Sequence, residues 1–294
     1  MRKSINAPTI SSTLMTVLIA MLSIAMISCG DDRDERGIDD DDDDDTDTGG
    51  YDTGPEEPEG CISMDIVFVI DNSGSMNEEQ TNLANNFPVF IEVLDDYTNP
   101  SGDHMEYRVA VTTTDADIPT AGEFVGQTEC GLGSDPWVDG PADDVVTKFA
   151  CMAAVGTGGS GSEKPFVTIQ EALGAKAEGG QVNNGFYREN QASLLVVVMI
   201  TDEDDRSEVQ AAEVKDFLTA LTGGQNRYVV VGIAGPQMCS STFGDAEEAI
   251  KIKELIDLVE DNGFFGDICE GDLSGSLADA LEVMQATCDD FGVE

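Results

Sequence analysis

Three oxygen-bearing side chains, spaced two residues apart, follow an apolar run at residues 66–70. The segment reads DIVFVIDNSGSMNEEQ over residues 65–80, and the three side chains are those of Asp71, Ser73 and Ser75. A loop that reverses over an ion can point side chains at positions i, i+2 and i+4 toward that ion. Carboxylate and hydroxyl oxygens are the ligands that hard divalent cations prefer. The segment therefore predicts a metal-binding loop at the end of a buried strand.

Two other apolar runs also end in oxygen donors. Residues 107–113 lead into Thr114 and Asp115, and residues 194–200 lead to Asp202. In an open α/β sheet, ligands bind outside the carboxyl ends of the strands, so these side chains are expected to converge with the first loop. Neither histidine nor cysteine accompanies them. The expected ion is therefore magnesium, calcium or manganese rather than zinc or copper.

A glycine-rich loop, GTGGSGSEKPF at residues 156–166, lies between the second and third of these strands and opens a helix. It offers three hydroxyl groups, those of Thr157, Ser160 and Ser162. Glu163 in the same loop, like Glu203 after the third strand, is interpreted as a helix cap or a support for the ligands rather than as a ligand.

Strands and helices alternate along the rest of the chain. Apolar, β-branched runs occur at residues 64–70, 107–113, 194–200 and 228–234, with a weaker run at 264–268. Patterns of helical period lie at residues 78–96, 163–178, 207–222, 246–261 and 275–288. Continuous rather than alternating apolar runs are typical of parallel strands that are covered on both faces. The fold class is therefore expected to be α/β, with a doubly wound, mostly parallel central sheet and helices on both faces.

Residues 115–160 interrupt this alternation with glycine, proline and aspartate. Within them, EFVGQ at 123–127 predicts a short edge strand, and 142–154 predicts a helix. Trp137 is expected to pack this insertion against the sheet, and an exposed position in contact with a partner is the alternative.

The strand-end motifs resemble those of von Willebrand factor type A domains over roughly residues 61–290. DIVFVIDNSGSM is similar to their Asp-x-Ser-x-Ser motif, and VVVMITDEDD is similar to a later strand that ends in Thr-Asp-Gly or Thr-Asp-Glu. The resemblance implies a Rossmann-like fold and a metal-ion-dependent adhesion site, with Mg²⁺ as the first choice of cation and Ca²⁺ or Mn²⁺ as alternatives.

The family's metal ligands map onto this sequence residue by residue. The matching residues are Asp71, Ser73, Ser75 and Asp202. GTGGSGSE departs from the commoner Gly-Gly-Thr of the family, so the loop ligand is assigned to Thr157, with Ser160 or Ser162 as substitutes. The alternative is structural: the serines cap the following helix, and Asp202 caps the helix at 207–222.

In the family, an acidic side chain of a partner completes the coordination of the cation, which implies that this chain binds a protein ligand and is not an enzyme. A metal-dependent, phosphatase-like hydrolase is a weaker alternative, because the residue two places after Asp71 is Ser73 where such enzymes carry a second aspartate. The single histidine, His104, has no matching nucleophile motif. A third possibility is a structural surface protein whose metal site is not adhesive.

The N-terminal segment predicts export and a lipid anchor. Residues 1–28 have a basic start and an apolar run too short to span a bilayer, and they end before Cys29 in a sequence that resembles a bacterial lipoprotein box. Residues 29–60 are expected to form a lipidated, disordered linker, because 31–60 hold 16 acids against two arginines. Residues 61–294 then form one domain, held at the cell surface or in the periplasm. An ordinary signal peptide is the alternative.

The net charge of −45 disfavours binding to nucleic acid. Six cysteines remain after Cys29, and an even number in an exported chain implies disulfides. Fifteen pairings are possible, and the preferred one joins Cys61 to Cys288, Cys130 to Cys151, and Cys239 to Cys269.

Overall fold

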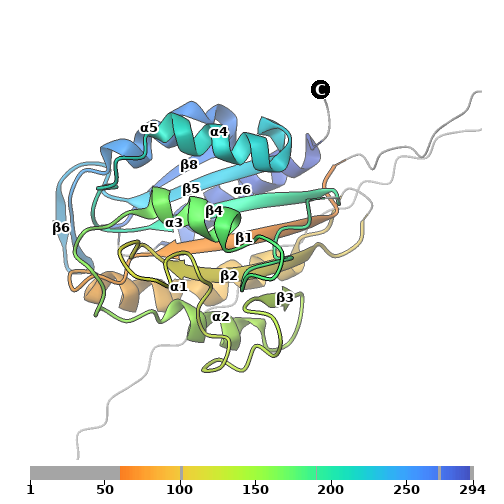
Figure 1. Ribbon diagram of the computed structural model, residues 1–294, viewed down its shortest axis with the longest axis horizontal. Coiled ribbons are helices and arrows are strands. Elements are labelled where there is room, and N and C mark those ends of the chain that lie inside the picture. Colours follow the sequence, from red (N-terminus) through yellow and green to blue (C-terminus); the bar gives the residue numbers. More distant parts are fainter. Residues whose placement is uncertain (1–59, 100–101, 190, 271–272, 292–294) are drawn as a thin grey trace, which may run out of the picture. The chain divides into compact units, whose positions relative to one another are not determined.

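The computed structural model describes residues 60–99, 102–189, 191–270 and 273–291. Cys29, the lipoprotein box and the acidic linker lie outside the described residues. A six-stranded sheet forms the centre, in the order β3-β2-β1-β4-β5-β8, which Figure 1 shows from bottom to top. Its strands are β1 (Ser63–Ile70), β2 (Glu106–Thr113), β3 (Val138–Gly140), β4 (Ser193–Ile200), β5 (Tyr228–Ala234) and β8 (Gly263–Asp267). A separate hairpin is formed by β6 (Cys239–Ser241) and β7 (Gly244–Ala246).

All neighbouring strands of the sheet are parallel except β3, which runs antiparallel to β2. Every residue of β1, β4 and β5 is buried, and nearly all are apolar instead of alternating with polar residues; the polar exceptions are Ser63, Asp65 and Ser193. The expected doubly wound, mostly parallel α/β fold is thereby confirmed.

Helices cover both faces of the sheet. One apolar core packs α1, α2 and α6 against the sheet around Phe68, whose ring contacts those of Phe87, Phe90 and Phe149. The other core packs α3, α4 and α5 against Val67, Val69 and their neighbours. The helices are α1 (Asn77–Asp96), α2 (Val145–Ala153), α3 (Pro165–Gln170), α4 (Ala211–Thr222), α5 (Ile250–Leu258) and α6 (Ser274–Asp289), with a π turn at Glu171–Ala175 and 3-10 turns at Gln225–Arg227 and Glu260–Asn262. Across the described part of the chain, no helix is both long and apolar enough to cross a membrane.

Two helices begin four residues later than the apolar pattern predicts. α4 begins at Ala211 instead of 207, because the carboxylate of Asp205 accepts hydrogen bonds from the backbone N–H and hydroxyl of Ser207 and holds that segment in a turn. Gln210 and Glu213 then form a capping box that starts the helix. α5 begins at Ile250 instead of 246, because the preceding residues belong to the β6–β7 hairpin.

The insertion differs from its prediction at the sheet edge. Residues 123–127 form no strand; Val125 donates one backbone hydrogen bond to Val111 (2.9 Å), and the edge position is taken by β3 instead. The helix expected at 142–154 is present as α2. Trp137 is 6% exposed and packs against Phe186 and the Arg108 guanidinium, so the exposed alternative is wrong.

Three disulfides join the parts of the domain, and their pairing is the expected one: Cys61–Cys288, Cys130–Cys151 and Cys239–Cys269. The first ties the start of β1 to the end of α6, where the Cys61 N–H also donates to the Cys288 carbonyl (2.8 Å). It closes a loop with a sequence separation of 227 residues, against 21 for Cys130–Cys151.

We expect loss of the Cys61–Cys288 bond to destabilise the domain more than loss of Cys130–Cys151. A longer closed loop removes more entropy from the unfolded chain, so the double alanine variant at Cys61 and Cys288 should lose about 3–5 kcal/mol. The double alanine variant at Cys130 and Cys151 should lose about 2 kcal/mol less than that. Urea unfolding of both variants measures the difference, and equal losses would contradict the loop-entropy explanation.

Candidate metal centre

The strand register brings three strand ends to one level. Ile70, the last residue of β1, pairs with Thr113 of β2 on one side and with Ile200 of β4 on the other. The residues that follow these three positions, which include Asp71 and Asp202, therefore emerge at the same edge of the sheet. This is the edge at which doubly wound folds bind ligands.

Asp71 organises the first loop. Its side chain is completely buried; Oδ1 accepts from the Ser73 N–H (2.7 Å), and Oδ2 accepts from the Thr201 hydroxyl (2.7 Å). Thr201 Oγ1 also accepts from the Glu203 N–H (3.1 Å). Asp71 thus links the loop after β1 to the loop after β4.

The two serines lie side by side at the mouth of this loop. The hydroxyl oxygens of Ser73 and Ser75 are 3.0 Å apart; Ser73 is buried, and Ser75 is exposed. Neither caps α1, whose N-cap residue is Met76 and which has no side-chain cap hydrogen bond. The capping alternative is therefore wrong for these serines, and it is also wrong for Asp202, because Gln210 caps α4.

Asp202 faces Asp71 from the end of β4. The Asp202 side chain is almost fully buried, and its Oδ1 has no hydrogen-bond partner. Burial is the main reason that its pKa rises to about 7; the Ser75 hydroxyl lowers the pKa, and the carboxylates of Asp71 and Glu79 raise it.

Glu163 is a third buried acid near Asp71. It is completely buried, its Oε2 accepts from the Thr114 hydroxyl, and its Oε1 has no hydrogen-bond partner. Burial raises its pKa to about 8; the Thr114 hydrogen bond lowers the pKa, and the negative charge of Asp71 raises it. Sequence reasoning set Glu163 aside, although an acid directly before a helix at a strand-end edge was a usable signal.

The glycine-rich loop is docked against the first loop by its backbone. Gly159 donates to the Asn72 carbonyl (2.7 Å), and the side-chain amide of Gln80 donates to both the Asp71 carbonyl (2.8 Å) and the Gly156 carbonyl (2.7 Å). A side chain at Gly159 would place its Cβ 2.4 Å from the Asn72 side chain, so glycine is required there.

The hydroxyl groups of this loop are less well placed than its backbone. Thr157 is exposed. The Ser160 hydroxyl accepts from the Ser162 N–H (3.1 Å), and the Ser160 N–H donates to Asp115 (3.4 Å). Of the five residues expected to bind the metal, the structure thus groups Asp71, Ser73, Ser75 and Asp202, whereas the Thr157 side chain lies toward solvent.

The residues at this edge fit a hard divalent cation. All the donors are carboxylate or hydroxyl oxygens, which suit Mg²⁺, Ca²⁺ or Mn²⁺. Buried oxygen atoms of Glu163, Asp202 and Asp115 have no hydrogen-bond partner, a costly arrangement unless a cation compensates it. When bound, the cation supplies a Lewis-acidic position that an oxygen atom of another molecule can occupy.

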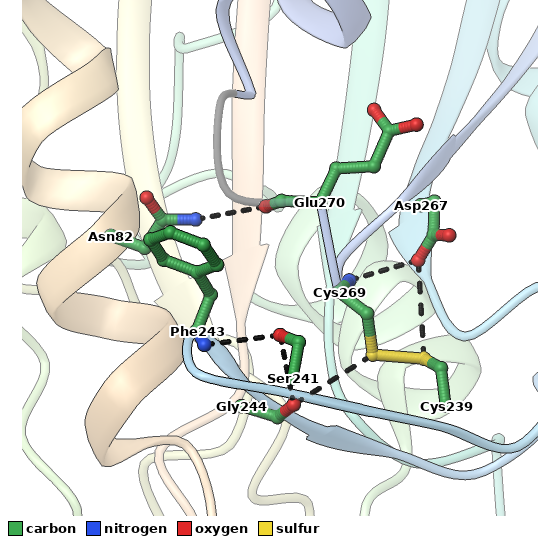
Figure 2. Close-up of a disulfide and its surroundings, with 8 residues drawn as sticks. All are labelled: Asn82, Cys239, Ser241, Phe243, Gly244, Asp267, Cys269 and Glu270. Carbon is green, nitrogen blue, oxygen red and sulfur yellow. Dashed lines mark hydrogen bonds between the residues drawn. A yellow bond between two sulfur atoms is a disulfide. The ribbon is translucent and has the colours of Figure 1, made fainter.

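A second cluster with possible metal ligands lies near the β6–β7 hairpin, at Cys239, Cys269 and Asp267. Figure 2 shows that the two sulfur atoms form a disulfide, and that Asp267 accepts from the Cys269 N–H (2.9 Å). Metal ions bind thiolates, and the sulfur atoms of a disulfide are not thiolates. This cluster is therefore a covalent link between the hairpin and the residues that follow β8, and not a metal site.

No family model matches the chain, and no curated protein matches it in sequence. Solved structures resemble it at low identity. Proximal thread matrix protein 1 from the mussel byssus matches with a TM-score of 0.43 and 16% identity, over 77% of this chain and 46% of its own. The same protein with a zinc-occupied MIDAS motif matches with a TM-score of 0.42 and 13% identity, over 77% and 49%. The open conformation of the pilus adhesin SpaC from Lactobacillus rhamnosus GG matches with a TM-score of 0.38 and 12% identity, over 80% and 31%. This chain spans less than half the length of each of these proteins.

Proposed function

We propose that this chain is a von Willebrand factor A-type binding protein that contacts a protein partner through a divalent cation. Asp71, Ser73, Ser75 and Asp202 hold the cation, and the glycine-rich loop supplies a further donor. The observation that supports this most directly is the meeting of Asp71 with Asp202, two buried carboxylates from separate strands. Burying two negatively charged carboxylates next to each other costs free energy, and a bound cation offsets that cost.

The position of the site suits binding from outside. Ser75 and the tip of the glycine-rich loop are exposed at the edge of the sheet, so a partner's oxygen atom can reach the cation without a channel. Among the residues described at this edge, we identify no nucleophile with an adjacent general base of the kind that hydrolases use. The residue two places after Asp71 is Ser73, where phosphatase-like enzymes carry a second aspartate. We therefore propose a binding role and not a phosphatase-like activity.

The proposed location is the cell surface or the periplasm, with a lipid on Cys29 and the acidic segment 29–60 as a tether. Three disulfides in the folded domain fit an oxidising compartment of this kind. The cation is proposed to be Mg²⁺, with Ca²⁺ and Mn²⁺ as alternatives of suitable ligand chemistry.

Selection from a displayed library of random peptides tests the binding role. In millimolar Mg²⁺ or Mn²⁺ the purified protein should retain peptides that EDTA releases, and the Asp202→Ala variant should retain none of them. Glu106→Gln is the matched control, because it removes an exposed negative charge at the opposite edge of the sheet, where Glu106 pairs with the first residue of β1. Peptides held equally well in EDTA, or a melting temperature that millimolar metal leaves unchanged, would favour a structural surface protein instead.

A further inference from the structure

A pocket lies between the first turns of α1 and the tip of the β6–β7 hairpin. Its volume is about 240 Å³, below the roughly 300–1,000 Å³ of sites that hold drug-sized molecules, so it suits a ligand with a single ring. Glu78 is the one charged residue of its lining. The uncharged residues are Asn77, Thr81, Asn82 and Asn85 from α1, and Thr242 and Phe243 from the hairpin.

The fold holds the walls of this pocket in place. The hairpin disulfide links β6 to the residues after β8, and Asn82 of α1 donates to the Glu270 carbonyl of that same segment (3.2 Å; Figure 2). At the tip of the hairpin, the Phe243 N–H donates to the Ser241 hydroxyl (3.0 Å). Gly244 packs so closely on α1 that a Cβ there would lie 1.6 Å from a carboxylate oxygen of that helix. The pocket is therefore formed before any ligand binds.

Some residues of the lining are not the types that the local structure favours. Thr81 and Asn85 occupy exposed positions inside a helix, where alanine, glutamate or lysine would be more favourable. Phe243 is 40% exposed in the turn of a hairpin, where glycine, asparagine or aspartate is usual. Surface positions that break such local rules point to a functional site.

The polar groups of the pocket leave donors and acceptors for a ligand. Asn85 uses one side-chain N–H, which donates to the Thr81 carbonyl (2.9 Å) and leaves its other N–H and its carbonyl oxygen. Within the described residues, neither the Asn77 amide nor the Thr242 hydroxyl makes a hydrogen bond. A neutral amide can bond to two neighbouring hydroxyl groups at once, donating to one and accepting from the other.

This combination of groups excludes several classes of ligand. An anion would be repelled by Glu78 and by the chain's net charge of −45. A basic side chain of a partner protein would meet a single acid that is exposed, which attracts it only weakly. A purely apolar ligand would leave the amides and hydroxyls without partners. A neutral ring with many hydroxyl groups avoids all three problems.

We propose that the pocket between α1 and the β6–β7 hairpin binds one sugar residue of a neutral glycan. The Phe243 ring packs its electron-rich face against the C–H groups of the sugar, and the amides of Asn77 and Asn85 bond to its hydroxyl groups. The pocket uses none of the proposed metal ligands, so the two sites can be tested separately. One ring makes few contacts, and the expected Kd is on the order of 1 mM.

Saturation-transfer NMR on the purified protein in EDTA tests this site. The probes are the methyl glycosides of glucose, galactose, mannose and N-acetylglucosamine, each at up to about 20 times the expected Kd. At least one should receive saturation, most strongly at the C–H groups that pack on Phe243. Phe243→Trp should keep this binding, whereas Phe243→Leu, which is apolar but has no π face, should weaken it about tenfold. No transfer to any glycoside, or equal binding by the two variants, would overturn the proposal.

The side-chain amide signals of the wild-type protein locate the sugar without any substitution. Those of Asn77 and Asn85 should shift during the titration, whereas that of Asn184, an exposed asparagine outside the pocket, should not. A sulfated form of the bound sugar should bind about tenfold more weakly, and equal affinity would contradict the neutral class of ligand. Binding that requires Mg²⁺ would place the sugar at the metal site and overturn the assignment. If the sugar binds in EDTA but Mg²⁺ leaves the melting temperature unchanged, the proposed function is wrong and this site stands.

Discussion

In EDTA, this domain should be more stable at pH 5 than at pH 8. The folded state raises the pKa of Glu163 to about 8 and that of Asp202 to about 7, from ordinary values of 4.5 and 3.8. Between pH 4 and pH 8 the unfolded chain therefore releases protons that the folded domain still holds. The free energy of unfolding falls as pH rises through this window, with a slope of up to about 1.4 kcal/mol per pH unit for each proton.

Saturating Mg²⁺ should flatten that slope, because the loaded site holds no more protons than the unfolded chain does over this range. The cation binds the deprotonated carboxylates, so protons compete with it, and its stabilising effect grows as pH rises from 5 to 8. Thermal unfolding at four pH values across this range, in EDTA and in Mg²⁺, measures both slopes. Glu163→Gln should flatten the slope in EDTA, whereas Glu106→Gln, at the opposite edge, should leave it unchanged. The same slope with and without Mg²⁺ would show that no cation binds these carboxylates.

The sheet was predictable because its signal is local. Parallel strands that are buried on both faces are apolar at most positions, and such runs stand out in any sequence. Because parallel strands end at the same edge of a sheet, Asp71 and Asp202 could be expected to lie close together from their positions just after two such strands. The grouping of four of the five expected metal ligands therefore needed no knowledge of side-chain geometry.

The burial of Glu163 could not be predicted from the sequence, because it depends on non-local contacts. Its carbonyl accepts from the Arg206 N–H, 43 positions away, and its carboxylate accepts from the Thr114 hydroxyl, 49 positions away. No window of the sequence reveals these contacts. The edge strand was misplaced for a similar reason. EFVGQ has good strand propensity, but β2 pairs with Val138–Gly140 instead, and edge pairing is decided by how the whole insertion packs.

Asp71→Asn should abolish the effect of the cation and still leave the metal-free domain about as stable as the wild type. The variant retains one acceptor for the Ser73 N–H, and the Thr201 hydroxyl has a second acceptor in the Glu203 carbonyl (3.1 Å). A lost hydrogen bond costs about 1 kcal/mol. Removing the Asp71 charge offsets that cost, because it relieves the repulsion of Glu163 and Asp202. The stabilisation that a cation provides, about 2.7 kcal/mol at 100 times its Kd, should be lost.

Asp65→Asn is the matched control, because Asp65 is equally buried on the same strand but has a cationic partner. Its carboxylate pairs with Arg188 (2.8 Å) and accepts from the Ser193 hydroxyl (2.8 Å) at the opposite end of β1. Breaking a buried ion pair leaves a buried charge uncompensated, so this variant should lose about 3–5 kcal/mol while its response to Mg²⁺ persists. Urea unfolding of both variants, with and without Mg²⁺, separates the two roles. A large loss for Asp71→Asn in EDTA would mean that Asp71 acts mainly as a structural residue, because a carboxylate kept for a cation should be dispensable to the fold once the cation is gone.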